Sequence, residues 1–581
     1  MIEGDNPMDF NEMSKKELIE YINQLNEEQS GKLGLVWDRE KVPEQIVLDC
    51  DKYIPILEEC DEKSIKNNSN IENLLIEGDN FHSLSVLNYT HKESIDVIYI
   101  DPPYNTGNKD FKYNDKYVDI EDGYKHSKWL NFMEKRLKLA KNLLKDNGVI
   151  FISIDDNEYS QLKLLCDKIF GVSCFIANFI RKTSYGEKTA KPKINKHHDY
   201  CLCYCKKYES IINNNVIGGE EKEFKEYSNP DNDPRGDWKK DSYLIKIDSG
   251  RYGYARYPIT NPYLNITHYP PVYYNEEDRK QWHYTEEKFK EMERNGQVVY
   301  YKTKEEMGNS SYSFYIKKYK DSISELRNNV STTFFDSNEY VNGNGSKDLV
   351  SVIGKGKSII GMYPKPVNFI KQLIKFSTCY NKDAVVLDFF AGSGTTAQAV
   401  LELNKEDGGN RKFIVCTNDE GNICSDITYP RCKTILTGQK NDDSTYNNII
   451  KSNLRYYKTS FVNNTGTRDQ LYYDLTEKCI PMLCIKESTH ILVEKNEEYV
   501  IYTDLNKTKY TCVYFDIFGV NYEKFISKIE KIDEYKSLYI FTLNDYVCLD
   551  ELMNVNNYDI EPIPYKILEL FKRIATDGLE D

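Results

Sequence analysis

Several features that define other classes of protein are missing from this sequence of 581 residues. No stretch approaches the ~18 consecutive apolar residues of a membrane-spanning helix, so we expect no membrane partner. Residues 1–20 are acidic and lack the basic start and apolar run of a signal peptide, which predicts a cytoplasmic location. The 15 cysteines include no CxxC pair, so we expect reduced thiols and no metal site.

The sequence also has no excess of basic residues. The 92 acidic and 77 basic residues leave a formal net charge of -15, whereas phosphate contacts from Lys and Arg supply most of the non-specific affinity for DNA. A DNA surface must therefore be local, and residues 176–207 offer a basic segment. Its candidate contacts are Arg181, Lys182, Lys188, Lys191, Lys193 and Lys196. A solvated charged loop explains the same segment equally well.

The order of predicted elements indicates an α/β fold. Buried strands are predicted over residues 73–78, 93–100 and 148–154. Between the last two, a helix carries Trp129, Met133 and Leu137 at helical spacing and is ended by Asn147 and Gly148. This arrangement is a βαβ unit, so we expect a Rossmann-like, mostly parallel sheet.

Residues 180–355 interrupt this rhythm, because they are rich in Tyr, Asn, Lys, Gly and Pro and show only short mixed patterns. The α/β pattern returns near residue 364 and includes a strand, a glycine loop, a helix and another strand. We expect one sheet interrupted by an insertion, preceded by a helical segment with Ser14 as an N-cap and followed by a small α/β domain. The predicted boundaries are 1–65, 66–179, 180–355, 356–438 and 439–581.

A first candidate site directly follows the strand over residues 93–100. Asp101, Pro102, Pro103 and Tyr104 stand at its carboxyl end, where open α/β sheets place their ligands. The prolines remove backbone donors, so carbonyl groups lie beside a carboxylate and an aromatic ring. These groups suit an exocyclic aromatic amine, which needs acceptors for its two hydrogens and a stacking partner for its ring. A rigid strand-to-loop turn is the alternative.

A second candidate site is the glycine loop over residues 388–396. Gly392 and Gly394 allow a tight turn and a close approach to a ligand, and the helix N-terminus that follows favours a carboxylate. The GxGxxG and GxxxxGK spacings are absent, which disfavours dinucleotide binding and nucleotide hydrolysis. The candidate ligand contacts are Asp388, Phe390, Ala391, Gly392, Gly394, Thr395 and, past the next strand, Asp419. A solvated turn explains Asp419 almost equally well.

Taken together, these motifs resemble those of the amino-methyltransferases of DNA. DPPY precedes AGSGTT, which is the circularly permuted motif order of the beta class. The resemblance implies catalysis by the DPPY motif, S-adenosyl-L-methionine as the cofactor at the glycine loop, and target recognition by the insertion. Lys365 in MYPKP and Asp79 in IEGDN resemble further cofactor-binding positions. Phe389 departs from the proline that the family usually has there.

Longer segments resemble the modification subunits of type III restriction-modification systems. They include GLVWDRE, DPPYNTGNKDFKYND, GVIFISIDDNE and NLRYYKT. This resemblance implies methylation of adenine N6 in double-stranded DNA by base flipping, a homodimer, and a restriction subunit as a partner. One alternative is N4-cytosine methylation, although Asp101 favours adenine because Ser is more usual at that position in N4-cytosine enzymes. A mainly DNA-recognising subunit, and an RNA or protein-glutamine methyltransferase, are the others.

Overall fold

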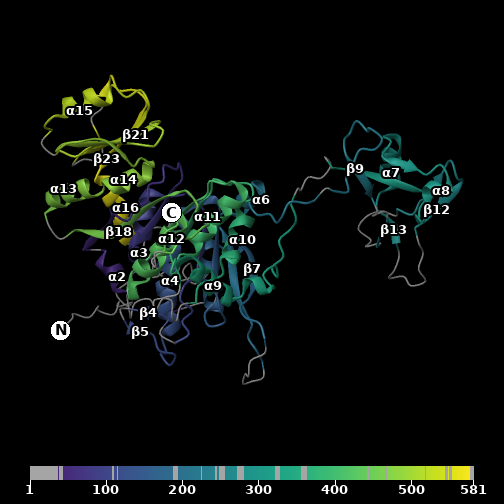
Figure 1. Ribbon diagram of the computed structural model, residues 1–581, viewed down its shortest axis with the longest axis horizontal. Helices are drawn as coiled ribbons and strands as arrows, with labels where there is room; N and C mark the ends of the chain where they lie inside the picture. The colour runs from purple at the N-terminus through teal and green to yellow at the C-terminus, as the bar shows by residue number, and fades with distance from the viewer. Residues whose placement is uncertain are drawn as a thin grey trace, which may run out of the picture. The chain divides into compact units, whose positions relative to one another are not determined.

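A computed structural model gives the architecture (Figure 1). The chain divides into two compact units, one made of Met1–Gly218 with Val330–Asp581 and the other of Gly219–Asn329. The structure describes residues 37, 44–50, 52–107, 110–113, 116–186, 194–223, 225–241, 245–247, 255–270, 280–320, 327–354, 363–440, 444–464, 467–516, 519–542, 547 and 552–575.

The large unit is built on a nine-stranded sheet of order β1-β18-β2-β17-β16-β3-β6-β8-β7. The six strands from β18 to β6 are parallel, and β1, β8 and β7 pair antiparallel at the two edges. The predicted Rossmann-like, mostly parallel α/β sheet is therefore confirmed. The strands are β1 Tyr53–Glu59, β2 Glu72–Glu77, β3 Ile95–Ile100, β6 Leu144–Ile154, β7 Phe175–Lys182, β8 His198–Cys205, β16 Val385–Asp388, β17 Lys412–Thr417 and β18 Asn453–Asn463.

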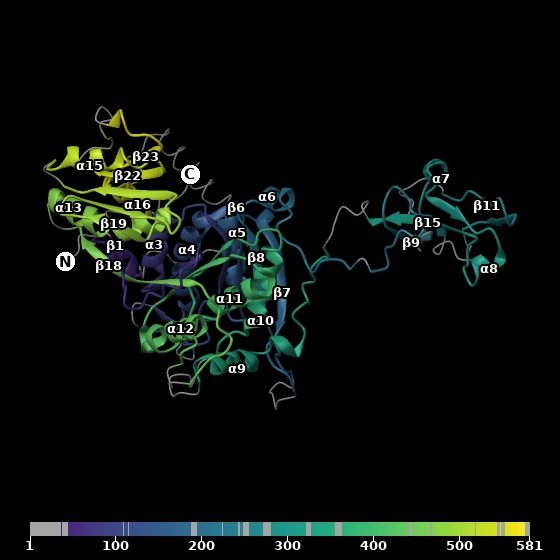
Figure 2. The same ribbon diagram turned by 45° about the horizontal axis from the view of Figure 1, so that its top comes forward.

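Helices cover both faces of this sheet (Figure 2). One layer contains α3 (Asn80–Thr90), α4 (Lys125–Leu143) and α5 (Tyr159–Phe170), and the other contains α10 (Val367–Ser377), α11 (Thr395–Asp407) and α12 (Tyr429–Thr437). The connection from β3 through α4 to β6 runs toward one edge of the sheet, and the connection from β16 through α11 to β17 runs toward the other. Because both crossovers are right-handed, the two helices lie on opposite faces.

The apolar face of α4 is buried as its helical spacing predicts, with Trp129, Met133 and Leu137 all in the core. The helix ends earlier than expected, at Leu143, because Leu144 already pairs with Ile95 as the first residue of β6.

The insertion is narrower than residues 180–355. Strand β8 belongs to the main sheet, where it pairs with β6 and β7, and its Cys201, Cys203 and Cys205 are buried. Helix α9 (Asn342–Ile353) packs against α12 in the large unit. The separate unit is Gly219–Asn329, and its own core includes Trp282, Phe289 and Phe314.

In its described residues, the insertion unit contains short antiparallel sheets and two helices. Its three-stranded sheet has the order β14-β15-β9, and the pairs β10-β13 and β11-β12 are two-stranded. The elements are β9 Trp238–Asp241, β10 Ile245–Ile247, β11 Ile259–Asn261, β12 Ile266–His268, β13 Lys280–Trp282, α7 Glu286–Arg294, β14 Val298–Tyr300, α8 Lys304–Met307 and β15 Phe314–Tyr319.

The two ends of the chain also differ from the expected boundaries. Ser14 and the helix predicted after it lie outside the described residues, while residues 53–59 form β1 of the main sheet rather than a helix. Strand β18 also belongs to the main sheet, although its residues were expected in the C-terminal domain. Beyond it lies a five-stranded sheet of β19 Ile491–Lys495, β20 Tyr499–Thr503, β21 Lys509–Tyr514, β22 Tyr535–Phe541 and β23 Tyr558–Ile563.

The C-terminal sheet is accompanied by α13 Arg468–Lys478, α14 Ile480–Glu487, α15 Tyr522–Ile529 and α16 Tyr565–Ala575. Helices α14 and α16 contact α3 and join the core of the large unit, whereas Tyr499, Phe525 and Leu538 belong to a separate core within this region. The remaining short elements are α2 Gln45–Asp49, β4 Lys112–Tyr113, β5 Lys116–Tyr117 and α6 Tyr208–Asn213. Among the described residues, no helix has the length and apolar character needed to cross a membrane.

Candidate active site

The two predicted sites meet at the centre of the main sheet. Strands β3 and β16 are parallel neighbours, and the chain leaves them in opposite directions, through α4 to β6 and through α11 to β17. Asp101 directly follows β3, and Asp388 is the last residue of β16. The carboxyl ends of two such strands form the topological switch point at which open α/β sheets bind ligands.

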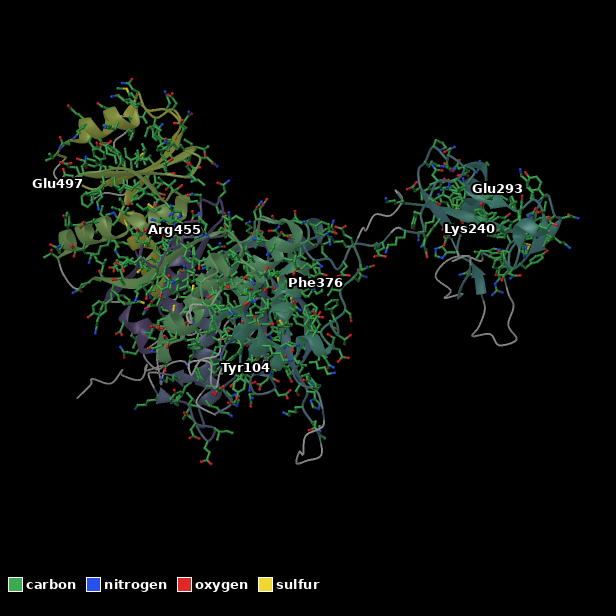
Figure 3. All side chains as sticks on the ribbon, viewed as in Figure 1. Tyr104, Lys240, Glu293, Phe376, Arg455 and Glu497 are labelled. Atoms are coloured by element: carbon green, nitrogen blue, oxygen red, sulfur yellow. The ribbon has the colours of Figure 1, made fainter. Side chains whose placement is uncertain are left out.

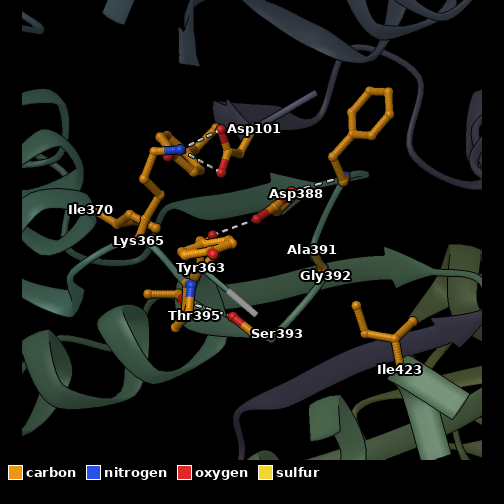
Figure 4. A pocket seen from close by; sticks show the side chains of 14 residues that line it. Asp101, Tyr363, Lys365, Ile370, Asp388, Ala391, Gly392, Ser393, Thr395 and Ile423 are labelled. Carbon is orange, nitrogen blue, oxygen red and sulfur yellow. Dashed lines mark hydrogen bonds and ion pairs between the residues drawn. The ribbon is translucent and has the colours of Figure 1, made fainter. Parts of the chain in front are cut away.

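Two cavities open at this point. The smaller, of about 180 Å³, lies between the DPPY motif and the glycine loop and is lined by Asp101, Lys365 and Asp388 (Figure 4). The larger, of about 740 Å³, falls within the range of about 300–1,000 Å³ that is usual for ligand sites. The two cavities share the lining residues Asp101, Phe390, Gly392 and Ile423. A ligand at the glycine loop can therefore reach the Asp101 carboxylate.

The DPPY motif is held on several sides. The indole Nε1 of Trp129 donates a hydrogen bond to the Pro103 carbonyl over 2.7 Å. Burial raises the pKa of the Tyr104 phenol well above its ordinary value, so the hydroxyl stays neutral. Figure 3 marks Tyr104 within the large unit. The indole of Trp129 thus fixes the Pro103 carbonyl in the middle of the motif.

Asn105, the residue directly after the DPPY motif, is also held by hydrogen bonds. It has a positive φ of 57°, a conformation that asparagine adopts more readily than most residues. Its Nδ2 donates to Glu158 Oε1 over 2.5 Å, and the same oxygen lies 2.7 Å from His126 Nδ1. Burial raises the pKa of the Glu158 carboxyl, although bonds from Asn105 and His126 oppose that shift. Glu158 was not singled out from the sequence, because its role depends on a contact across 53 residues.

Lys365 contacts the DPPY motif, although the sequence placed it among the cofactor-binding residues. Its Nζ donates to Asp101 Oδ1 and Oδ2 over 2.6 and 2.7 Å and to the Tyr104 hydroxyl over 2.8 Å. The side chain is only 9% exposed. Its hydrogen bonds to protein atoms are therefore on the DPPY side of the small cavity.

The glycine loop has the backbone that its sequence predicts. Gly392 and Gly394 have φ values of 48° and 75°, and Gly394 is the N-cap of α11. A Cβ on Gly394 would lie 3.1 Å from Thr428 Cγ2, so a side chain there is strained as well as crowded. Arg431, which sequence analysis missed, is buried and donates from Nη1 to the Ser393 carbonyl over 3.0 Å.

Asp388 supports the loop from inside. It accepts hydrogen bonds from the Phe390 amide, over 2.9 Å, and from the Thr396 hydroxyl. Burial nevertheless raises the pKa of the Asp388 carboxyl to about 7. Because the folded pKa lies above the unfolded value, the contribution of Asp388 to stability is greatest in acid and is lost as pH rises from about 4 to about 7.

We expect Asp388→Asn to flatten this pH dependence. We compare the free energy of unfolding of the variant with that of wild type. Between about pH 5 and about pH 8, this difference should shift in favour of the variant by roughly 3 kcal/mol. Urea unfolding at both pH values measures the difference. Asp407→Asn is the control, because bonds from Arg411 overcome the effect of burial and lower the pKa of Asp407. Its contribution to stability changes only below about pH 4, so its curve should run parallel to that of wild type over this range. Parallel curves for wild type and Asp388→Asn would contradict the prediction.

The large cavity takes its remaining walls from several segments. Asp79 lines it and accepts a hydrogen bond from the Phe81 amide over 2.7 Å as the N-cap of α3. Asp419 does not line either cavity, because its carboxylate accepts from the Ser425 amide and hydroxyl over 2.9 and 3.1 Å. Its neighbours Asn418 and Glu420 do line the large cavity.

The N-terminal segment contributes a wall that the sequence did not reveal. Glu44, Gln45, Ile46 and Asp49 line the large cavity. Glu44 is held there by the buried Arg136, which donates to its two carboxylate oxygens over 2.8 and 2.9 Å. No local pattern in residues 44–49 signals this role, because the partner lies on α4.

The basic segment is only partly exposed. Arg181 is buried, pairs with the Asp199 carboxylate and donates to the Tyr340 carbonyl over 2.8 Å, so its expected DNA contact is corrected to a structural one. Lys182 is half-buried, and Lys196 is exposed with its Nζ 2.9 Å from Asp156. Lys188, Lys191 and Lys193 lie outside the described residues.

The DPPY motif, with its hydrogen-bond acceptors, meets the glycine loop at the switch point of a mostly parallel sheet. This arrangement defines an α/β group-transfer protein. Residues 95–505 match the family described as DNA methylase, and the chain belongs to that family. This confirms the resemblance to DNA amino-methyltransferases.

Curated relatives extend the comparison. The Mod subunit of the type III restriction-modification enzyme StyLTI from Salmonella typhimurium is 34% identical over 63% of this chain and 55% of its own length. The EcoPI Mod subunit from Escherichia phage P1 is 32% identical over 61% and 59%. The type II methyltransferase M.KpnI from Klebsiella pneumoniae is 33% identical over 61% and 82%. The chain thus spans little more than half the length of the two Mod subunits, and its resemblance to such subunits is confirmed.

Proposed function

We propose that this protein transfers a methyl group from S-adenosyl-L-methionine to the N6 atom of adenine in double-stranded DNA. The observation that carries the proposal is the position of Asp101, which lines the same two switch-point cavities as Phe390 and Gly392 of the glycine loop. Family membership and the Mod and type II methyltransferase relatives support it.

The described residues fit this cofactor. Gly392 and the N-terminus of α11 would hold its carboxylate, because helix N-termini favour negative charge. Asn418 and Glu420 would meet its ribose hydroxyls, while Phe390 and Ile423 offer apolar surface to its base. When bound, the cofactor supplies an electrophilic methyl group on a sulfonium.

The DPPY motif would prepare the acceptor amine. The lone pair of an exocyclic amine is delocalised into the ring, so the nitrogen is a weak nucleophile. Asp101 would accept a hydrogen bond from the amine and favour a more tetrahedral nitrogen, with the Pro102 carbonyl as the second acceptor. Tyr104 would stack on the extruded base, which offsets part of the few kcal/mol that flipping costs. Positioning and acceptor dipoles supply the catalysis.

We assign target recognition to the insertion. Its separate core allows its surface to vary without disturbing the catalytic sheet. Its strand β9 carries the exposed Lys240 (Figure 3). The Lys240 Nζ lies 5.2 Å from the ring centroid of Tyr301, just after β14, and 4.7 Å from that of Tyr315 on β15. Rings beside a cation are suited to bases and phosphates. By analogy with the Mod relatives, we further propose a homodimer and association with a restriction subunit.

The test is methyl transfer from labelled S-adenosyl-L-methionine to duplex plasmid DNA from a methylation-deficient host, followed by nucleoside analysis. We expect labelled N6-methyladenine. Labelled N4-methylcytosine would keep the mechanism but overturn the choice of base. Label in neither nucleoside, with cofactor binding intact, would favour a subunit that mainly recognises DNA.

A further inference from the structure

The ammonium of Lys365 occupies the position that the proposed reaction requires for the target amine. We propose that Lys365 is a positioning residue for the target base: it holds Asp101 and Tyr104 in place without DNA and leaves them when the base enters. This inference rests on the proposed function and moves Lys365 from the cofactor side of the site to the base side.

The hydrogen bonds of Lys365 are fully used by the DPPY motif. An ammonium has three N–H donors, and the three contacts at 2.6, 2.7 and 2.8 Å go to the two oxygens of Asp101 and to the Tyr104 hydroxyl. The same nitrogen lies 4.9 Å from the centroid of the Tyr104 ring. Lys365 thereby satisfies a carboxylate that is only 27% exposed and orients the ring beside it.

The ammonium and a target amine compete for these groups. Each oxygen of Asp101 already accepts one hydrogen bond from Lys365, so an amine that donates to the same lone pair must displace the ammonium. The amine nitrogen also gains positive charge as the methyl group arrives, and a neighbouring ammonium opposes that charge. The base therefore replaces Lys365 before transfer, by an exchange of hydrogen bonds in which no covalent bond changes.

The backbone behind Lys365 is held firmly, so the exchange is confined to its side chain. The next residue, Pro366, is the N-cap of α10, and the Val367 amide donates to Asp348 Oδ2 over 3.0 Å. Gly345 of α9 lies so close that a Cβ there would be 2.0 Å from the Pro364 carbonyl oxygen. The four-carbon stem of lysine has the rotatable bonds that such an exchange needs.

Substitution of Lys365 tests whether this residue acts on the target base or on the cofactor. For Lys365→Met we expect kcat to fall about tenfold, since Asp101 and Tyr104 lose their support, and KM for plasmid DNA to fall at least about threefold, since the competitor is gone. The Kd for S-adenosyl-L-methionine, measured by calorimetry without DNA, should stay within about twofold of wild type. Lys365→Arg should restore part of kcat because it keeps a cation.

The control is Lys371→Met on α10. Lys371 is similarly buried, at 11% exposure, and pairs with Glu402 and Glu406 away from both cavities. It should change stability but not the kinetic constants. A cofactor Kd that rises tenfold in Lys365→Met with an unchanged KM for DNA would return Lys365 to the cofactor side. Unchanged kinetics in Lys365→Met would also overturn the inference.

A second measurement does not depend on methyl transfer. Acetylation of lysines in the DNA-free protein, followed by mass spectrometry, should modify Lys365 at least about threefold faster in Asp101→Asn than in wild type, because the ion pair protects it. The rate at Lys371 should not change. Equal rates at Lys365 would refute the inference, whereas wild type that transfers no methyl group would instead refute the proposed function.

Discussion

Asp101→Asn should lower the rate of methyl transfer to DNA by roughly 100- to 1,000-fold, the range found when one preorganised hydrogen-bonding group is removed from a reacting centre. The amide has nearly the same shape, but one acceptor oxygen becomes an NH₂ group that donates toward the target amine. Single-turnover transfer measures the rate, and calorimetry should show that cofactor binding persists.

Asp96→Asn is the control for that variant. Asp96 also lies on β3, but at its opposite end, where it accepts from the Val385 amide and from Lys145 over 2.8 Å each. The change should reduce stability by about 1–3 kcal/mol and leave transfer per folded molecule unchanged. Near-normal transfer by Asp101→Asn would remove the DPPY motif from the mechanism.

Gly345→Ala should disturb the active site from behind. A Cβ at Gly345 would lie 2.0 Å from the Pro364 carbonyl oxygen and 2.8 Å from the Lys365 carbonyl carbon, so backbone must move. Such overpacking typically costs about 1–3 kcal/mol. The displaced backbone includes that of Lys365. We therefore expect kcat/KM for DNA to fall by about tenfold or more as well. Urea unfolding and steady-state methylation measure the two effects.

Gly343→Ala provides a matched control in the same helix. Gly343 is exposed, and a Cβ there has nothing within 4 Å. Alanine should therefore stabilise α9 by at most about 1 kcal/mol and leave methylation unchanged. Equal activity of Gly345→Ala and Gly343→Ala would show that the Pro364–Lys365 segment tolerates displacement.

Local pattern predicted much of the fold and of the site. The apolar run ending at Ile100 predicted β3, and DPPY therefore had to stand at a strand end. Gly392 and Gly394 predicted the tight turn before α11, and both have the positive φ that such a turn uses. These features depend on neighbouring residues, through strand burial and the steric freedom of glycine. The motif order led to the family that the comparisons then confirmed.

Charged side chains were less predictable. Arg181 belonged to a basic segment in the sequence, yet it is buried against Asp199. Asp419 stood after a strand as a ribose-binding carboxylate would, but its Oδ1 accepts from the amide and the hydroxyl of Ser425. A charge that leaves water needs a partner, and sequence spacing does not say which partner folding will bring.

The sequence by itself thus determined the chemistry at the ends of β3 and β16, because strand periodicity and glycine conformation are local properties. Tertiary structure alone decided how those ends are completed. It brought Lys365 to Asp101 across 264 residues and Glu44 to Arg136 across 92. Hydrogen bonds and ion pairs act only over a few ångströms, so such partners are chosen when the sheet assembles.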